Sequence, residues 1–235
     1  MGIIVTIGGY ESESQKDQTI NTPIEIDKKI LSLTGKKKPK VLFVPTASKD
    51  STGYINSITK IYEGQLSASM KSLLLHGEKL TTKEIQELID WADVIYVGGG
   101  NTLMMMKKWR RLGVDKMLKR AHKEGTVLCG VSAGSICWFD YGVSDSLHFY
   151  DDKTMKYIKV AGLGILPGVH CPHFGSKLYD KGFRTAGMKE IMKRSKGKCT
   201  AIPDGGALVH ENGKVSSIGE ASSLAWWEEG EWLTL

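Results

Sequence analysis

The sequence predicts an α/β fold in which a doubly wound, mostly parallel sheet is flanked by helices. Short apolar runs alternate with amphipathic segments of about 10–15 residues, which is the pattern of repeated strand–helix–strand units. Glycine-rich turns follow several of these runs, as is typical where buried strands end in loops. The last third of the chain differs, because the Asn212-Gly213 pair separates two apolar runs and favours a tight hairpin turn. We therefore expect C-terminal β-hairpins in addition to the parallel sheet.

The expected elements follow the apolar periodicity in chain order. Strands are expected at Ile3–Ile7, Val41–Val44, Ser69–Leu75, Val94–Val97 and Thr126–Cys129, with hairpins at 207–218 and 224–233. Helices are expected at Thr22–Leu33, Tyr54–Tyr62, Thr81–Trp91, Thr102–Leu112 and Val114–Glu124, and from Ser135 to Phe139. No linker or repeat interrupts this pattern, so we expect a single domain that covers residues 1–235.

The composition is that of an ordinary globular chain without a membrane span. Its 235 residues are 41% hydrophobic and 25% charged, and no apolar run reaches the length of about 18 residues that a spanning helix needs. The stretch Met1–Gly9 lacks a basic region and is typical of a first strand rather than a secretion signal. The four cysteines form no Cys-x-x-Cys pair, and they are Cys129, Cys137, Cys171 and Cys199. This usage favours reduced core thiols in a cytoplasmic protein over disulfides or a metal site.

The net charge of +6 does not indicate a nucleic-acid partner. Much of it lies in two lysine-rich runs, Lys36–Lys40 and Lys193–Lys198, each directly before an expected strand. Such runs are typical of solvated loops and helix ends. No aromatic residues are interleaved with them, and the chain holds no helix-turn-helix or RNP-like pattern. We therefore expect neither nucleic-acid nor membrane binding.

Gly130-Val131-Ser132-Ala133-Gly134 has the G-x-S-x-G pattern and lies between an expected buried strand and an expected helix. In that context the glycines allow a sharp turn, which exposes the serine side chain at the sheet edge. The N–H groups of the following helix point to the same place and would stabilise developing negative charge. Because the pattern is short, a glycine-lined turn with a buried structural serine is the alternative. The strand–turn–helix context favours Ser132 as a nucleophile.

Gly98-Gly99-Gly100-Asn101 follows another expected strand and has several interpretations. Glycines at a helix N-terminus can cradle a phosphate, but neither G-x-x-x-x-G-K-[ST] nor G-x-G-x-x-G continues from this run. An oxyanion hole fits better, because the Gly99 N–H would pair with the N–H of Ala133, the residue after the nucleophile. A plain flexible turn is the third interpretation. Asn101 or Thr102 is expected to cap the next helix, and Asn101 is also a candidate substrate-binding residue.

A serine needs a base within hydrogen-bond reach before it becomes a good nucleophile at neutral pH. Six histidines are available, of which His76, His122 and His210 are expected in surface loops, helix faces or hairpins. His170 and His173 lie directly after an apolar run, in a segment rich in turn residues. This segment is a strand end, where an active-site base is expected. The residues alone do not distinguish between these two histidines.

Three motifs occur in order along the chain: VGGGNT at Val97–Thr102, GVSAGS at Gly130–Ser135 and CPHFG at Cys171–Gly175. Together they resemble the peptidase E family of serine peptidases, and the resemblance extends from the first strand to about Gly206. It implies a fold similar to that of the class I glutamine amidotransferases. It also implies that His173 is the base for Ser132, with oxyanion donors at Gly99 and Ala133.

The resemblance implies two candidates for the acidic member of the triad. The family's acid lies in a Pro-Glu-Gly turn, which matches Pro203-Asp204-Gly205, so here an Asp must come one methylene closer to the imidazole. Asp145 matches a second acidic position linked to activity in the family, and either carboxylate could hold the histidine tautomer. Of the two we favour Asp204, which leaves Asp145 as a loop or capping residue.

Arg184 lies near the position of a family arginine that binds an acidic substrate side chain. A bidentate guanidinium clamp suits a carboxylate, and this would make Arg184 a substrate-binding residue. The alternative is a helix-start arginine that faces solvent. The chain departs from the aspartyl dipeptidase pattern between Asp140 and Gly164, so a strict requirement for an N-terminal Asp is not expected.

The expected function is that of a cytoplasmic serine exopeptidase, similar to a dipeptidase, which cleaves short peptides through an acyl-enzyme. Substrates with an N-terminal acidic residue are implied by the family resemblance. This chemistry needs neither a metal nor an organic cofactor. One alternative is another hydrolase or an acyl transferase on the same triad, and a second is an inert small-molecule-binding protein with this fold. The sequence does not indicate an oligomeric state.

Overall fold

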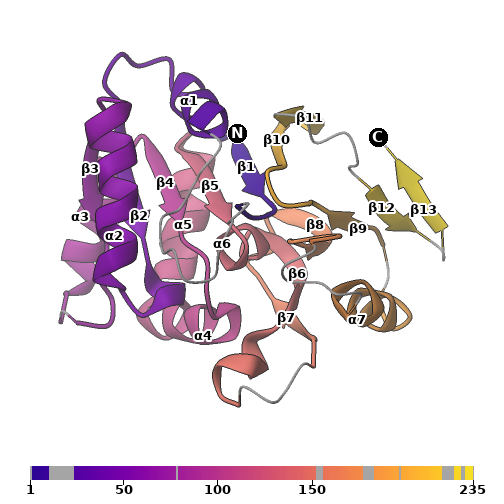
Figure 1. Ribbon diagram of the computed structural model, residues 1–235. Coiled ribbons are helices and arrows are strands. Elements are labelled where there is room, and N and C mark those ends of the chain that lie inside the picture. The colour runs from indigo at the N-terminus through magenta and orange to yellow at the C-terminus, as the bar shows by residue number, and fades with distance from the viewer. Residues whose placement is uncertain are drawn as a thin grey trace.

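A computed structural model describes residues 2–10, 24–77, 79–151, 156–176, 183–195, 197–218, 225–228 and 231–234. Figure 1 shows the chain coloured from indigo at the N-terminus to yellow at the C-terminus. In this part of the chain the strands form two sheets, one of seven strands and one of six. The expected single sheet is divided in two, because Phe139–Ser144 pairs with later strands and not with the first sheet.

The first sheet combines parallel strands with an antiparallel hairpin at one edge. Its parallel strands are, in spatial order, β1 (Ile4–Ile7), β5 (Val127–Val131), β4 (Val94–Val97), β2 (Lys40–Val44) and β3 (Ser69–Ser72). The hairpin consists of β10 (Ala207–Glu211) and β11 (Lys214–Ile218). Its turn residues Asn212 and Gly213 have φ of 49° and 77°, as a tight two-residue hairpin turn requires. The first predicted hairpin is therefore confirmed.

Successive side chains of the parallel strands point to opposite faces of the sheet and form two apolar layers, one on each face. On β2, for example, Val41 and Phe43 belong to one layer, whereas Leu42 and Val44 belong to the other. The first face is covered by α1 (Ile24–Ser32) and α2 (Thr52–Thr59), and the second by α3 (Thr82–Trp91), α4 (Thr102–Leu112) and α5 (Val114–Lys123). Helices on both faces of a mostly parallel sheet confirm the predicted fold class.

The second sheet has the spatial order β13-β12-β9-β8-β6-β7. Its strands are β6 (Phe139–Ser144), β7 (Ile158–Ala161), β8 (Leu166–Cys171), β9 (Cys199–Ala201), β12 (Ala225–Glu228) and β13 (Glu231–Thr234). Strand β8 is parallel to β6 and β9, whereas β12 and β13 form the second predicted hairpin. Helix α7 (Phe183–Met192) packs on this sheet through Met188 and Met192 (Figure 1).

The helix that begins within the Gly130–Gly134 motif is shorter than predicted. Helix α6 (Ala133–Ile136) has four residues, and Phe139, which was expected to end it, begins β6 instead. The reason is pairing: Tyr141 aligns with Ala161 of β7 and with Val169 of β8, so the segment is a central strand. Pairing between segments distant in sequence thus outweighs the local preference for helix.

Other element boundaries shift by a few residues. Helix α2 continues as a π-helical turn at Lys60–Gln65, and the capping box predicted from Thr81 and Glu84 is present at the start of α3. The expected N-cap Thr22 lies outside the described residues. All four cysteines are buried and free, as predicted. Within the described ranges, no helix has both the length and the apolar character needed to cross a bilayer.

Candidate active site

Ser132 lies between β5 and α6, at the edge where the parallel strands of the first sheet end. Its backbone has φ 55° and ψ −114°, which is a sparsely populated conformation for a residue with a side chain. Its N–H donates to the Ile7 carbonyl at the end of β1, at 3.1 Å. This strained strand-to-helix turn is the geometry of a nucleophile elbow.

Two glycines allow the elbow to pack tightly against the sheet. A Cβ at Gly130 would overlap the carbonyl oxygen of Gly134, and a Cβ at Gly134 would overlap the carbonyl oxygen of Val97 on β4. The backbone of α6 therefore lies directly against β4 and β5, at a separation that only glycine permits. These close approaches determine where the side chain of Ser132 is held.

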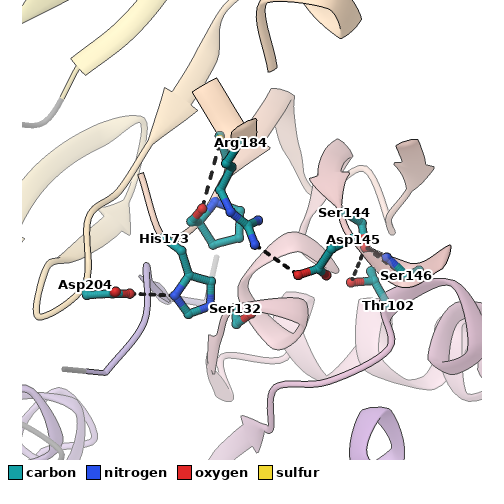
Figure 2. A network of polar contacts seen from close by, with 10 residues as sticks. Thr102, Ser132, Ser144, Asp145, Ser146, His173, Arg184 and Asp204 are labelled. Atoms are coloured by element: carbon teal, nitrogen blue, oxygen red, sulfur yellow. Dashed lines mark hydrogen bonds and ion pairs between the residues drawn. The ribbon is translucent and has the colours of Figure 1, made fainter. Parts of the chain in front are cut away.

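His173, in the loop after β8, has its imidazole oriented as a general base requires. Its Nε2 lies 2.9 Å from Ser132 Oγ, and its Nδ1 lies 2.5 Å from Asp204 Oδ1 (Figure 2). A carboxylate can only accept a hydrogen bond, so Nδ1 carries the hydrogen and Nε2 is left to accept the serine proton. The structure thus brings together Ser132, His173 and Asp204 in one line of hydrogen bonds.

Asp204 reaches the imidazole because the loop after β9 lies against the turn after β1. The Gly205 N–H donates to the Gly9 carbonyl at 3.0 Å, and Gly9 and Asp204 form an isolated parallel bridge. A Cβ at Gly9 would overlap both Asp204 Oδ1 and His173 Nδ1. The absence of a side chain at Gly9 therefore gives the short Asp side chain the room to approach.

The Asp204 carboxyl is held in its charged form. Burial alone would raise its pKa, but the hydrogen bond and charge of His173, together with a hydrogen bond from Ser176 and the charge of Arg184, outweigh burial, so the pKa lies below its ordinary value. The side chains of His173 and Asp204 are 13% and 10% exposed, which limits screening by water. The charged carboxylate can therefore stabilise the imidazolium that forms when His173 takes up a proton.

Asp145 lies apart from the imidazole and binds Arg184 instead. Arg184 Nη2 donates to Asp145 Oδ2 at 3.1 Å, and the guanidinium lies over the ring of Tyr157, 4.9 Å from its centroid. The Arg184 side chain is 3% exposed and that of Asp145 is 44% exposed. Figure 2 shows Arg184 extending between His173 and Asp145, so this arginine faces the site and not solvent.

Hydroxyl groups fix the loop that carries Asp145. The Oγ atoms of Ser144 and Ser146 lie 2.7 Å apart, and Ser144 Oγ also donates to Thr102 Oγ1 at 3.3 Å (Figure 2). The Leu103 N–H donates to Ser146 Oγ at 3.0 Å. These bonds tie the loop to the first turn of α4, and the carboxylate that holds Arg184 is thereby kept in place.

The two expected oxyanion donors both adjoin the nucleophile. A Cβ at Gly99 would lie 3.5 Å from Ser132 Cβ, and Ala133 directly follows Ser132 as the first residue of α6. In the described part of the chain, the Ala133 N–H donates to no protein acceptor. The Gly99 N–H, by contrast, donates to the hydroxyl oxygen of Tyr54 at 3.2 Å. Ala133 is therefore the donor that is available without rearrangement.

Asn101 caps α4, as one of its two interpretations predicted. Its Oδ1 accepts from the Met104 N–H at 2.9 Å, and its Nδ2 donates to the Ser146 carbonyl at 3.4 Å. The residue is 3% exposed. Because both ends of the buried carboxamide are engaged inside the protein, the structure does not support the expected role of Asn101 in substrate binding.

A second serine–histidine pair lies behind the elbow. His170 Nδ1 donates to the Thr200 carbonyl at 2.9 Å, and its Nε2 accepts from Ser135 Oγ at 2.9 Å. His170 is fully buried, and burial lowers its pKa to about 3. It is therefore a neutral histidine of the core without access to a substrate. His122, expected on a helix face, is buried as well.

Gly9 and Tyr54 are the site residues that sequence reasoning missed. The Gly8-Gly9 turn follows β1 directly, but its contact with Asp204 and His173 depends on how the two sheets meet. Tyr54 lies in the first turn of α2, after the loop that follows β2. Its place in a connection at the carboxyl end of a parallel strand was the available signal.

Comparisons with known proteins identify relatives of this chain. The profile of "Peptidase family S51" matches residues 12–218. The chain is 33% identical over 205 residues to the "Uncharacterized peptidase YgaJ" of Bacillus subtilis, covering 87% of this chain and 81% of that protein. It is 26% identical over 188 residues to the "Peptidase E" of Haemophilus influenzae, covering 77% and 81%. The crystal structure of a peptidase from an acI-B1 Actinobacterium has the same fold, with TM-score 0.69, 18% identity and coverage of 100% and 97%.

The resemblance indicated by the three sequence motifs is thereby confirmed. The family match begins at residue 12, ends with the last residue of β11 and includes all three motifs. Because this match covers well over half of the chain, the protein belongs to peptidase family S51 and is a serine peptidase.

Proposed function

We propose that this protein is a dipeptidase-like exopeptidase in which Ser132 attacks short peptides. The observation that carries the proposal is the line of contacts from Asp204 through His173 to Ser132 Oγ. Ser132 Oγ forms a bond to the scissile carbonyl carbon, the carbonyl electron pair moves to oxygen, and the serine proton passes to His173 Nε2. The C–N bond then breaks and His173 gives this proton to the leaving amine. A water molecule then attacks the acyl-enzyme by the same steps, with Ser132 as the leaving group.

Each neighbouring group has a separate role in this proposal. Asp204 holds the imidazole in the tautomer that can accept the serine proton. The backbone donors at Ala133 and Gly99 adjoin Ser132 and would stabilise the oxyanion of the tetrahedral intermediate. All of these groups belong to this chain, and the proposed steps use neither a metal nor an organic cofactor.

We propose further that Arg184 favours substrates with an N-terminal acidic residue. Its guanidinium is buried and faces the side of the site where His173 lies (Figure 2). Because Arg184 already binds Asp145, a substrate carboxylate would share the guanidinium and not neutralise an isolated charge. The preference for acidic residues is therefore expected to be graded rather than absolute.

A panel of dipeptides tests the substrate proposal. The wild type should cleave peptides with a free N-terminal Asp, Glu, Asn or Leu, with the highest kcat/KM for the acidic residues, and N-acetylation should reduce cleavage. Arg184→Gln should lower kcat/KM for Asp dipeptides more than for Leu dipeptides, because only the former have a carboxylate to bind. Since Arg184 is buried, covalent labelling of Ser132 by a fluorophosphonate serves as the folding control. Equal losses on acidic and neutral peptides would contradict the role of Arg184.

We propose that the enzyme acts in the cytoplasm. Its four cysteines are buried as free thiols. Thiols in this state are typical of a reducing compartment, in which structural disulfides do not persist. Cysteine usage is the observation that supports this location.

A further inference from the structure

The Gly99 N–H, one of the two proposed oxyanion donors, is engaged in the structure. It donates to the hydroxyl oxygen of Tyr54 at 3.2 Å. A backbone N–H has a single hydrogen, so this bond must be broken or shared before Gly99 can serve a substrate oxygen directly. The hydroxyl of Tyr54 therefore occupies the position to which this donor points.

The ring of Tyr54 is held in place by packing. It meets Phe43 of β2 edge-on, with ring centroids 5.1 Å apart and planes at 71°. A Cβ at Gly98 would lie 2.9 Å from Tyr54 Cε1, so the missing side chain at this turn gives the ring its space. A ring packed against β2 and the glycine turn keeps its hydroxyl at the N–H of Gly99, the residue that adjoins Ser132.

The hydroxyl of Tyr54 retains a hydrogen that it can donate. Burial raises the pKa of Tyr54 to about 12, although the hydrogen bond from Gly99 acts in the opposite direction, so the group stays protonated at neutral pH. Within the described residues, no protein acceptor takes this hydrogen. A hydroxyl that accepts a hydrogen bond is polarised by it and becomes a stronger donor.

We propose that Tyr54 is a catalytic residue whose O–H donates to the oxyanion, so that the Gly99 N–H acts through it while the Ala133 N–H donates directly. The proposal rests on the proposed function, since it requires an anionic oxygen to form beside Ser132. Tyr54 gives a hydrogen bond and transfers no proton; the serine proton still passes to His173. A preorganised hydroxyl donor of this kind stabilises the transition state more than the neutral carbonyl of the substrate.

Tyr54→Phe tests the proposal because it removes the hydroxyl and keeps the packed ring. We expect kcat to fall about 100-fold while KM stays within about threefold, since the lost hydrogen bond is made to the transition state. Tyr96→Phe is the matched control: its ring packs on the same Phe43, with centroids 5.8 Å apart, and its buried hydroxyl has no partner in the described residues. The control should retain wild-type kcat and KM.

An unchanged or raised kcat in Tyr54→Phe overturns the proposal. A raised value would mean that the hydroxyl merely blocks the Gly99 N–H. A crystal structure of the wild type with a peptide boronate on Ser132 gives a second measurement that needs no variant. Tyr54 Oη should then lie within hydrogen-bond distance of a boronate oxygen, at about 2.5–3.0 Å. A separation too long for a hydrogen bond overturns the proposal as well.

The rate of Ser132 phosphonylation by a small fluorophosphonate separates this proposal from the peptidase proposal. The reaction needs oxyanion stabilisation but no peptide. Slower labelling of Tyr54→Phe than of the wild type and Tyr96→Phe supports the role of Tyr54, even where no dipeptide is cleaved and the substrate proposal fails. Equal rates overturn the role of Tyr54 and leave the peptidase proposal standing. A wild type that is not labelled at all overturns both.

Discussion

The proposed reactivity of Ser132 depends, at the scale of single residues, on which nitrogen of His173 carries the hydrogen. Asp204 Oδ1 accepts from Nδ1 at 2.5 Å, and this leaves Nε2 beside Ser132 Oγ at 2.9 Å. The other tautomer would direct a hydrogen at the serine and could not take its proton. Asp204 is therefore proposed as a positioning residue, which acts through the imidazole.

We expect Asp204→Asn to lower kcat by about 10³- to 10⁴-fold, because a carboxamide can donate to Nδ1 and favour the unproductive tautomer. Asp145→Asn should act mainly on KM for acidic dipeptides, since Asp145 binds Arg184 and not the imidazole. Steady-state kinetics of both variants check this, with Asp90→Asn, a surface partner of Arg120, as the control. A kcat loss in Asp145→Asn as large as that in Asp204→Asn would show that the acid is wrongly assigned.

His170 shows, also at the level of single residues, that a serine–histidine contact is not by itself a catalytic pair. The pKa of its buried imidazole is lowered from 6.5 to about 3, so the folded protein keeps it neutral where the unfolded chain would take up a proton. The stability that this provides is complete above pH 6.5 and is lost as the pH falls from 6.5 towards 3.

We therefore expect His170 alone to reduce the free energy of unfolding by about 2 kcal/mol between pH 7 and pH 5. Urea denaturation of the wild type and of His170→Asn at both pH values measures this contribution. The variant is expected to be less stable overall, but its loss between the two pH values should be smaller by about that amount. The same pH dependence in both proteins would mean that His170 is not held neutral in the folded state.

At the scale of elements, the elbow depends on α6 packing so closely against β4 and β5 that no side chain fits at the contact positions. Gly134 lies against the Val97 carbonyl, and Gly130 lies against the Gly134 carbonyl. Both contacts are between backbone groups, which cannot rotate away as a flexible side chain would. The strained backbone of Ser132 is maintained by this packing.

Gly134→Ala is expected to reduce the free energy of unfolding by about 3 kcal/mol or more, because the added methyl group overlaps the backbone of β4. Gly64→Ala is the control, since a Cβ there has no atom within 4 Å, and its stability should be equal or slightly higher. Urea unfolding of the two variants gives both values. A Gly134→Ala protein as stable as Gly64→Ala would contradict the close packing of the elbow.

Sequence patterns predicted those elements whose signals are local. The apolar runs that became β1, β2, β4 and β5, and the capping box of α3, depend on neighbouring residues and appear where expected. The change from α6 to β6 could not be predicted from local signals, because Phe139–Ser144 is a strand through its pairing with β7 and β8. The division of the strands into two sheets has the same cause.

The residues of the candidate site also differ in whether local sequence signals predict them. Ser132 could be predicted from its own elbow, whereas His170 and His173 lie on and just beyond the same strand and could not be distinguished from residue types alone. The family resemblance implied His173, and the structure places it against Ser132. The position of Tyr54 after β2 indicated the correct edge of the sheet, but its contact with Gly99 could not be predicted, because the two residues meet only in the folded chain.

At the scale of the whole molecule, the candidate site is made of residues that follow strands of both sheets. Ser132 follows β5 of the first sheet, whereas His173 and Asp204 follow β8 and β9 of the second. One apolar cluster includes residues of both, among them Leu42 on β2 and Val160 on β7. The packing between the sheets therefore sets the distance from the imidazole to the serine.

The most direct test is the rate at which the wild type and Ser132→Ala release free amino acids from an N-terminal Asp dipeptide at neutral pH. We predict that the wild type hydrolyses the peptide and that Ser132→Ala lowers kcat by at least about 10³-fold with an unchanged melting temperature. Hydrolysis at the wild-type rate by Ser132→Ala would mean that another group attacks the peptide, and would contradict Ser132 as the nucleophile.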